Sequence, residues 1–329
     1  MTVTEILDQI ATRTVLVVGD ICLDRWQRYD PKLSEPSRET GIPRLAVTRT
    51  LNTPGAAGTV ASNLTALLAK HVAVLGIIGE DGFGAELERS LIAREISPEL
   101  VVRTNKMPTF TYSKLINIET DVEDRPRVDF VYADPIPSDV EDSVIELLRG
   151  FWSAFDVVIV SDQAETEQGG VITPAVRDTI GELAAGDPGK VVWVDSRVRA
   201  EHFRHTILKS NDDEAAAACK RAFGEVDLDR LQRHTQSPLL VMTDGPRGAL
   251  WVRDGEHHRV PTRHVEKPVD ICGAGDSFSA GTSLALSITQ SPDEAVRFGN
   301  IVASITIMKK GTGVATPIEV MMADHTWPA

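Results

Sequence analysis

The 329-residue chain has few residues of the kinds that define several special classes of protein. Its three cysteines, Cys22, Cys219 and Cys272, lie far apart and include no Cys-x-x-Cys pair. A disulfide framework and a structural zinc site are therefore not expected. No apolar run approaches the roughly 18 residues that a membrane-spanning helix requires. The N-terminus also lacks the basic-then-apolar pattern of a signal peptide, so we expect a cytoplasmic protein with no membrane partner.

The chain also lacks an excess of basic residues. Its 34 Lys+Arg face 48 Asp+Glu, which gives 34 − 48 = −14 with His neutral. This balance argues against a nucleic-acid partner, because binding to phosphates in general requires a basic surface. Apolar residues make up 42% and charged residues 25% of the chain, as in ordinary globular domains. The length suits one large α/β domain or two ordinary ones.

Short apolar runs, each followed directly by small polar or acidic residues, predict buried parallel strands. They span residues 15–18, 157–160, 191–194 and 239–242, and helical patterns separate them at 59–70, 171–185 and 212–222. This alternation predicts a single α/β domain over 1–329, with a doubly wound, mostly parallel sheet flanked by helices. The polar residues that end the strands would then meet at one ligand-binding edge. The plainer alternative is that strands simply end in polar residues.

Two stretches interrupt this alternation, at about 25–51 and 108–132. The second alternates polar and apolar residues, a pattern typical of β-strands with one solvated face. We expect the two segments to pair into a small β lid over the site, the alternative being an exposed hairpin. Because exposed strand edges tend to pair with other strands, we also expect a homodimer joined through this lid.

The sharpest motif is the segment Asp270-Ile271-Cys272-Gly273-Ala274-Gly275-Asp276-Ser277-Phe278. Its two glycines let backbone amides approach an anion closely, and amides at a helix N-terminus favour negative charge. An amphipathic helix is predicted to follow. Asp276 could simply cap this helix, but the second acid six residues earlier favours a functional site.

This segment resembles the Asp-x-x-Gly-Ala-Gly-Asp-x-Phe signature of the ribokinase-like (phosphofructokinase-B) carbohydrate kinases. Further matches follow in order along nearly the whole chain: Gly19-Asp20 with Asp24, residues 54–67, residues 79–84, Asn211-x-x-Glu214 and Thr243-x-Gly245-x-x-Gly248. The nearest branch resembles the heptose-7-phosphate kinases, through residues 19–25, 37–39, 127–129 and 161–162. The resemblance implies transfer of the γ-phosphoryl group of ATP, with Mg²⁺, to a hydroxyl of a sugar or sugar phosphate.

The resemblance also implies a role for individual residues. Asp276 would be the general base beside an anion hole formed by the amides of Gly273, Ala274 and Gly275. The ATP site would comprise Asn211, Glu214, Thr243, Gly245, Gly248 and Asn300, with Glu214 also holding Mg²⁺ through water. The acceptor site would comprise Asp20, Asp24, Gly55, Thr59, Lys114 and Arg127. A monovalent cation would lie near Asp270.

Several of these residues also have plain structural interpretations. Asn211-x-x-Glu214 could merely begin a helix, the turn after Thr243 could be an ordinary β-turn, and Asn300 could lie on a helix surface. The basic residues in or beside the lid, namely Arg25, Arg38, Arg44, Lys114 and Arg127, could pair with acids across it. Their clustering in an acidic chain otherwise favours an anionic acceptor, such as a phosphosugar. Aromatic residues are only 5% of the chain, which disfavours a nucleoside.

The chain departs from the family pattern mainly in its acceptor half. Ala56 replaces the second of two paired glycines, Thr59 replaces an asparagine and Cys272 replaces a threonine. The alternative of a catalytically silent ligand sensor on the same fold therefore stays open. A nicotinamide oxidoreductase is disfavoured, because no G-x-G-x-x-G sequence follows the first strand.

Overall fold

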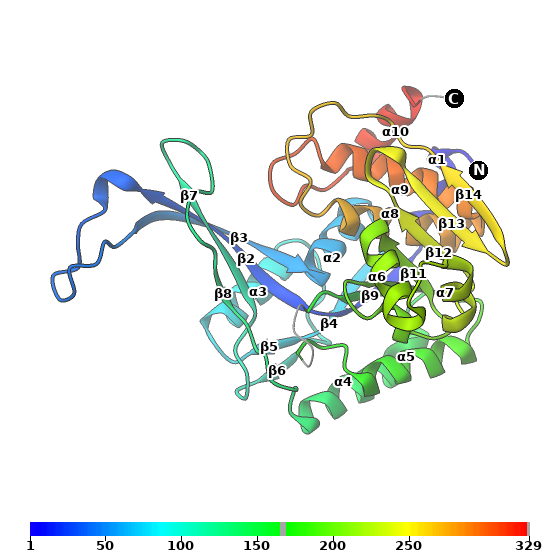
Figure 1. Cartoon of the computed structure of the whole chain (residues 1–329), viewed down its shortest axis with the longest axis horizontal. Coiled ribbons are helices and arrows are strands. Elements are labelled where there is room, and N and C mark those ends of the chain that lie inside the picture. The colour runs from blue at the N-terminus through cyan, green and yellow to red at the C-terminus, as the bar shows by residue number, and fades with distance from the viewer. Residues whose placement is uncertain (165–168, 328–329) are drawn as a thin grey trace.

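The computed structural model describes residues 1–164 and 169–327 (Figure 1). Its main sheet has the strand order β14-β13-β12-β11-β10-β9-β1-β4. The strands are β1 (Thr14–Gly19), β4 (His71–Leu75), β9 (Val157–Asp162), β10 (Val191–Ser196), β11 (Ile207–Asn211), β12 (Leu240–Thr243), β13 (Ala249–Arg253) and β14 (Glu256–Val260). Neighbours from β4 to β12 pair in parallel, and β13 and β14 complete the sheet antiparallel. The predicted doubly wound, mostly parallel α/β sheet is confirmed.

The apolar runs became central strands because both faces of the sheet are covered. Val15 and Val17 join one buried cluster, whereas Leu16 and Val18 join the cluster on the other face. All of these side chains are fully buried. Burying an aliphatic side chain of this size contributes roughly 1.5–3 kcal/mol, so continuous apolar runs are strongly favoured in such strands.

Helices cover the two faces of the main sheet. The core cluster on one face includes residues of α1 (Val3–Ile10), α2 (Ala57–Ala66), α3 (Gly82–Ile92), α8 (Ala274–Thr289), α9 (Pro292–Thr306) and α10 (Pro317–His325). The cluster on the other face includes residues of α4 (Ser138–Phe151), α5 (Pro174–Gly186), α6 (Asp212–Phe223) and α7 (Leu228–Thr235). Within the described residues, no helix has both the length and the apolar character needed to cross a membrane.

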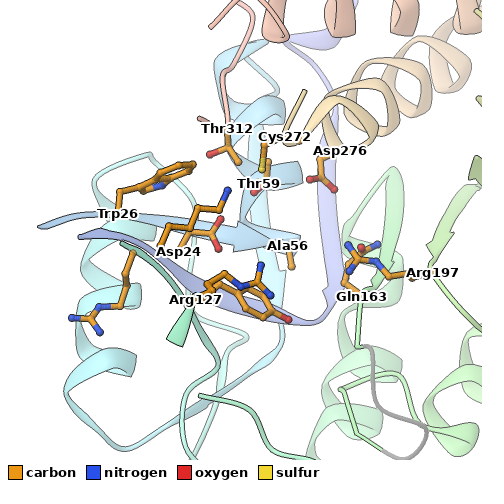
Figure 2. A pocket seen from close by; sticks show the side chains of 14 residues that line it. Asp24, Trp26, Ala56, Thr59, Arg127, Gln163, Arg197, Cys272, Asp276 and Thr312 are labelled. Atoms are coloured by element: carbon orange, nitrogen blue, oxygen red, sulfur yellow. The ribbon is translucent and has the colours of Figure 1, made fainter. Parts of the chain in front are cut away.

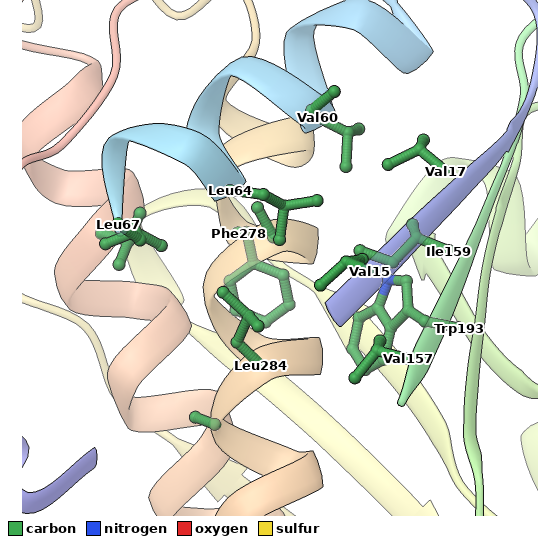
Figure 3. Close-up of a cluster of buried hydrophobic side chains, with 14 of the residues drawn as sticks. Val15, Val17, Val60, Leu64, Leu67, Val157, Ile159, Trp193, Phe278 and Leu284 are labelled. Carbon is green, nitrogen blue, oxygen red and sulfur yellow. The ribbon is translucent and has the colours of Figure 1, made fainter. Parts of the chain in front are cut away.

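Helix α8 differs from the amphipathic helix expected after the glycine motif. Its residues from Ser277 to Leu286 are all buried. The helix packs against α1, α2 and α9 as well as β9 and β10. Figure 3 shows Phe278 and Leu284 of this helix among side chains of α2 and the sheet. The expected polar face is made of small residues such as Ser279 and Gly281, which pack inside the protein.

A second sheet extends from the α/β body (Figure 1). It has the order β3-β2-β7-β8 and contains β2 (Ile21–Asp30), β3 (Ala46–Ala56), β7 (Thr111–Asn117) and β8 (Val128–Phe130). The segments around 25–51 and 108–132 therefore pair with one another, outside the main sheet. Strands β2 and β3 also run several residues further than these bounds, to Ile21 and Ala56. This extension carries β2 and β3 to the edge where β1 ends. We call this second sheet the lid sheet.

A smaller pair of strands completes the arrangement next to the lid sheet. Strands β5 (Ile77–Gly79) and β6 (Val102–Thr104) pair in parallel. The carboxylate of Asp81 caps α3 by accepting a hydrogen bond from Gly84 N at 2.7 Å, and it also accepts one from Thr109 N at 2.8 Å. The glycine-rich loop at residues 79–84 therefore joins α3 to the chain that leads into β7.

Candidate active site

A cavity of about 200 Å³ lies between the lid sheet and the N-terminus of α8 (Figure 2). Several residues predicted for the site line it together: Asp24, Thr59, Lys114, Arg127, Gly273 and Asp276. Sequence reasoning assigned no site role to other lining residues: Trp26, Tyr112, Gln163, Arg197 and Thr312. The position of Arg197, just after the polar end of the run 191–194, was the available signal for that residue. We call this hollow the lid cavity.

Asp276 reaches the lid cavity from the first turn of α8. The capping residue is Gly273, with a φ of 79°, and no side chain caps this helix. The interpretation of Asp276 as the helix cap is therefore wrong, and its carboxylate is available for other contacts. Burial and the nearby charge of Asp195 raise the pKa of Asp276 to about 7, although the charge of Lys209 acts to lower it. A group with this pKa can accept a proton at neutral pH.

Asp24 lies in β2, diagonally across from Gly55 of β3, whose register partner is Cys22. A Cβ atom added to Gly55 would lie 2.6 Å from the carboxylate of Asp24, so glycine at this position makes room for that carboxylate. The thiol of Cys22 donates a weak hydrogen bond to Asp24 at 3.7 Å. Burial raises the pKa of Asp24 to about 6, although Lys114 and Arg127 act to lower it.

Asp20, which was predicted to bind the acceptor, does not line the lid cavity. Its carboxylate accepts hydrogen bonds from the backbone amides of Gln163 and Ala164 at 2.8 Å and of Val171 at 2.7 Å. Burial is the largest cause that raises its pKa, to about 6, and Asp162 adds to it. Asp20 therefore fixes the chain after β9, since both of its oxygens have backbone partners, and its role toward the acceptor stays a prediction.

Ala56 and Thr59 border the lid cavity where the family pattern has a glycine and an asparagine. The φ of Ala56 is 51°, in the region that favours glycine. A side chain held there costs on the order of 1–3 kcal/mol, so the backbone retains a glycine-like turn after the glycine is lost. The hydroxyl of Thr59 donates to Pro54 O at 3.4 Å, at the start of α2.

Two basic residues at the lid cavity, Lys114 and Arg127, contact groups within the lid sheet. Lys114 Nζ lies 4.4 Å from the ring centre of Trp26. Arg127 pairs with Asp129 at 2.8 Å and stacks on Tyr112, its Cζ atom 4.8 Å from the ring centre. The acidic partner of Arg127 is thus only two residues away along the chain and not across the lid, and both cations also line the lid cavity.

A second cavity, of about 490 Å³, lies on the other side of the α8 N-terminus. The predicted nucleotide residues that line it are Thr243, Gly245, Gly248 and Asn300, together with Ala274 and Gly275 of the anion-hole segment. Asn300 is buried, so the interpretation as a surface helix residue is wrong. Its amide donates to the carbonyls of Val260 at 3.2 Å and Pro261 at 3.3 Å. We call this hollow the body cavity.

The anion-hole segment therefore separates the two cavities. Gly273 faces the lid cavity, whereas Ala274 and Gly275 face the body cavity. The first amides of a helix have no partner within the helix, and they favour an anion in front of them. An anion that enters from the body cavity would consequently lie close to Asp276.

Asn211 and Glu214 form a capping box at the start of α6, which confirms the structural interpretation of this motif. Asn211 Oδ1 accepts from Glu214 N at 2.8 Å, and Glu214 Oε2 accepts from Asn211 N at 2.8 Å. Burial raises the pKa of Glu214. A water-held Mg²⁺ fits this donor set, because Mg²⁺ at kinase sites uses one or two carboxylates together with substrate phosphates. In the described part of the chain, no cluster of three or more metal-binding side chains exists that could hold an ion alone.

Asp270 is held between two backbone segments. Its carboxylate accepts from Cys272 N at 2.9 Å and from Gly311 N at 3.0 Å. These bonds tie the anion-hole segment to the chain after α9, which brings Thr312 to the lid cavity. The monovalent cation predicted near Asp270 stays a prediction.

Comparisons with known proteins agree with this arrangement. Residues 191–319 match the model of the pfkB family carbohydrate kinases. "Bifunctional protein HldE" from Rhodopseudomonas palustris (strain TIE-1) is 31% identical over 323 residues, covering 95% of this chain and 64% of that protein. The chain therefore spans less than two thirds of that relative's length.

Solved structures share the fold at lower sequence identity. Ribokinase from Thermotoga maritima has a TM-score of 0.69 at 20% identity, over 94% of this chain and 99% of that one. A putative ribokinase II from E. coli has a TM-score of 0.66 at 16% identity, over 95% and 99%. These comparisons agree with the family resemblance seen in the sequence: residues 191–319 match a pfkB family carbohydrate kinase domain, and the chain has the ribokinase fold.

Proposed function

We propose that this protein is an ATP-dependent kinase that phosphorylates a hydroxyl group of a phosphorylated sugar. The observation that carries the proposal is the pair of cavities that meet at the α8 N-terminus, with Asp276 at their junction. The acceptor binds in the lid cavity and the nucleotide in the body cavity. The HldE relative and the resemblance to heptose-7-phosphate kinases support the same class of acceptor.

Asp276 takes the proton of the attacking hydroxyl. Asp24 accepts a hydrogen bond from another acceptor hydroxyl, since carboxylates accept such bonds readily. The amides of Gly273, Ala274 and Gly275 stabilise the charge on the phosphoryl group as the bond from the acceptor oxygen forms and the bond to the leaving ADP oxygen breaks. Phosphoryl transfer depends mainly on positioning and charge stabilisation, so few protein groups are needed.

The body cavity suits a nucleotide. The E. coli neighbour is described as a complex with ATP and Mg²⁺. Most residues that line the cavity here are apolar or glycine, and its polar and charged side chains are those of Thr243, Thr262, Arg263, His264, Asn300 and Ser304. Glu214 would hold Mg²⁺ through water, with Asn211 near the phosphates, and the ion would neutralise charge on the phosphoryl oxygens. A monovalent cation near Asp270 is part of the same proposal.

The acceptor's own phosphate is proposed from the cations of the lid cavity. Arg25, Lys114, Arg127 and Arg197 all line it, although the whole chain has a net charge of −14. Guanidinium groups bind phosphate through parallel hydrogen bonds, which are stronger than neutral ones. The acids that line the same cavity are Asp24 and Asp276, and both have roles toward hydroxyl groups.

Arg127→Ala is expected to lower kcat/KM for phosphorylated sugars about 10- to 100-fold, because a hydrogen bond to a charged group contributes roughly 1.5–3 kcal/mol. The kcat/KM for matched unphosphorylated sugars should fall only slightly. A coupled assay of ADP release measures both. Arg103→Ala is the control, since Arg103 also pairs with an acid, Glu88 at 2.6 Å, but lies outside the lid cavity. If free sugars are turned over faster than phosphorylated ones, and Arg127→Ala lowers kcat/KM equally for both kinds, the proposal of a phosphorylated acceptor is wrong.

The same assay tests the alternative of a silent ligand sensor. A sensor would bind sugars, as seen by a raised melting temperature, without releasing ADP. The retained glycine turn and Asp276 favour the kinase.

A homodimer through the lid sheet is expected in solution, because the sheet's edge strands carry exposed apolar side chains. Leu51 is 59% and Val128 is 52% exposed, and open edges of this kind favour pairing. Light scattering should give about twice the 35.8 kDa of one chain. Leu51→Glu should reduce the measured mass to that of the monomer, whereas Ile92→Glu, at an equally exposed site on α3, should not. If the parent protein is a monomer, the proposed dimer is wrong, but the kinase function is not affected.

A further inference from the structure

A buried ion pair lies behind the anion-hole segment, and the sequence predicted no pairing of its two residues. Lys209 of β11 and Asp195 of β10 are register partners in the main sheet, and each is 5% exposed. Lys209 Nζ donates to Asp195 Oδ2 at 2.7 Å. Residues two positions earlier on these strands, Trp193 and Ile207, belong to the apolar core on the α8 side. The pair therefore replaces what would otherwise be apolar core.

The ammonium group lies directly against the catalytic turn. A Cβ atom added to Gly275 would lie 2.9 Å from Lys209 Nζ. Asp195 Oδ2 also accepts a hydrogen bond from Ser279 Oγ at 3.2 Å, one turn further along α8. The ion pair thus contacts α8 twice, once at the glycine whose amide would stabilise the phosphoryl group and once just after Asp276.

A purely structural role explains this placement poorly. Burying two charges costs several kcal/mol, and well-packed apolar residues are often as stable or more so. The pair lies directly behind the turn at which an anion would bind, and a cation there adds to the field of the helix N-terminus.

We propose that Lys209 and Asp195 are positioning residues for phosphoryl transfer: Lys209, fixed by Asp195, holds the turn at Gly275 and keeps Asp276 ionised so that it can accept a proton. The proposal rests on the kinase function above. It assigns the two charges of the pair opposite effects on Asp276.

Other charges also act on Asp276, and they set the background for a test. The titratable and charged groups of the surrounding elements are Asp24 and Cys22 of β2, Arg197 after β10, Glu214 of α6 near Lys209, and Cys272 before α8. Within this set, Asp195 raises the pKa of Asp276 and Lys209 lowers it. These directions agree with the geometry.

The test compares Lys209→Met with Asp195→Asn in the full chain. The pKa of Asp276 is measured by ¹³C NMR of labelled aspartate without nucleotide, with the signal assigned from Asp276→Asn. Lys209→Met should raise this pKa and Asp195→Asn should lower it, each by about one unit, as expected for a charge in a buried site. Arg221→Met, which breaks the pair with Glu201 outside both cavities, should leave it unchanged. Shifts in the same direction, or none, would overturn the proposal.

Turnover provides the second readout. Lys209→Met should lose activity near pH 7 and recover part of it at pH 9, because the proton-accepting form returns at high pH. Asp195→Asn should retain activity to lower pH than the parent protein.

Either single variant leaves one buried charge without its partner, which destabilises the fold. The double variant Lys209→Met/Asp195→Asn avoids this problem. It should fold but turn over at least about 10-fold more slowly, because the turn at Gly275 loses its cation. Parental turnover in the double variant would overturn the proposal. If the parent protein phosphorylates no sugar, the kinase function fails, whereas the NMR titration still tests the ion pair.

Discussion

Asp276→Asn is expected to lower turnover at least about 100-fold while nucleotide affinity stays nearly unchanged. The amide keeps the size of the side chain but cannot take the proton of the attacking hydroxyl, and a general base typically contributes 10²–10⁴-fold. Because Asp276 does not cap α8, the exchange should leave the helix start intact. The measurements are ADP release under saturating substrates and calorimetric titration with an ATP analogue. Near-parental turnover would refute Asp276 as the base.

The pH profile gives an independent check on the same residue. Because the pKa of Asp276 is raised to about 7, the proton-accepting form increases from pH 6 to pH 8. Parental kcat should rise through this window. The residual rate of Asp276→Asn should lack that rise, whereas Asp142→Asn, at an exposed position of α4, should retain it.

The stability of Asp276→Asn should change in the opposite sense to its activity. A carboxyl whose pKa is higher in the folded state than in the unfolded state binds extra protons when folded, so it destabilises the protein as pH rises between those values. For Asp276 this window extends from its unperturbed value of 3.8 to about 7. Asp276→Asn should therefore melt at a higher temperature at pH 8, by an amount corresponding to at most about 4 kcal/mol. The difference should vanish near pH 4, and equal melting at pH 8 would contradict the raised pKa.

Gly55→Ala is expected to reduce kcat/KM for the acceptor about 10- to 100-fold. The new Cβ atom would lie 2.6 Å from the carboxylate of Asp24, so this carboxylate must leave its position beside the lid cavity. Loss of a hydrogen bond to a charged acceptor costs roughly 1.5–3 kcal/mol. The effect should appear in the acceptor's KM, and nucleotide affinity should be unaffected because Gly55 lies outside the body cavity.

A double-mutant cycle separates this explanation from general damage to the fold. If Gly55→Ala acts by displacing Asp24, it should add little to the loss already caused by Asp24→Ala. Additive losses would show that Gly55 matters for another reason. Gly150→Ala is the matched control, since a Cβ atom there would meet no atom within 4 Å.

The sequence by itself predicted the features that depend on neighbouring residues. The run Val15–Val18 predicted a buried parallel strand, because only a strand covered on both faces favours four consecutive aliphatic side chains. The two glycines before Asp276 predicted a turn open to an anion, since glycine alone makes both the positive φ of Gly273 and the close approach at Gly275 inexpensive. These patterns, and the family they match, were sufficient for the fold and for the location of Asp276.

Only the tertiary structure decided which of two similar residues belongs to the candidate site. Asp20 and Asp24 are four residues apart and of one type. Asp20 nevertheless turns inward and accepts hydrogen bonds from backbone amides, while Asp24 faces the lid cavity. The choice depends on where the chain after β9 passes, and that segment lies more than 140 positions away in the sequence. No local pattern contains this information.

The same reason explains why the pairing of Lys209 with Asp195 was missed and why the predicted polar face of α8 was wrong. Residues fourteen positions apart meet because β10 and β11 are adjacent and in a particular register, and a helix becomes buried on all sides only when other helices close around it. Local conformational preferences act over a few residues and can be recognised in the sequence. Burial and the partners of charged groups are set by long-range packing, so they are decided when the strands and helices come together.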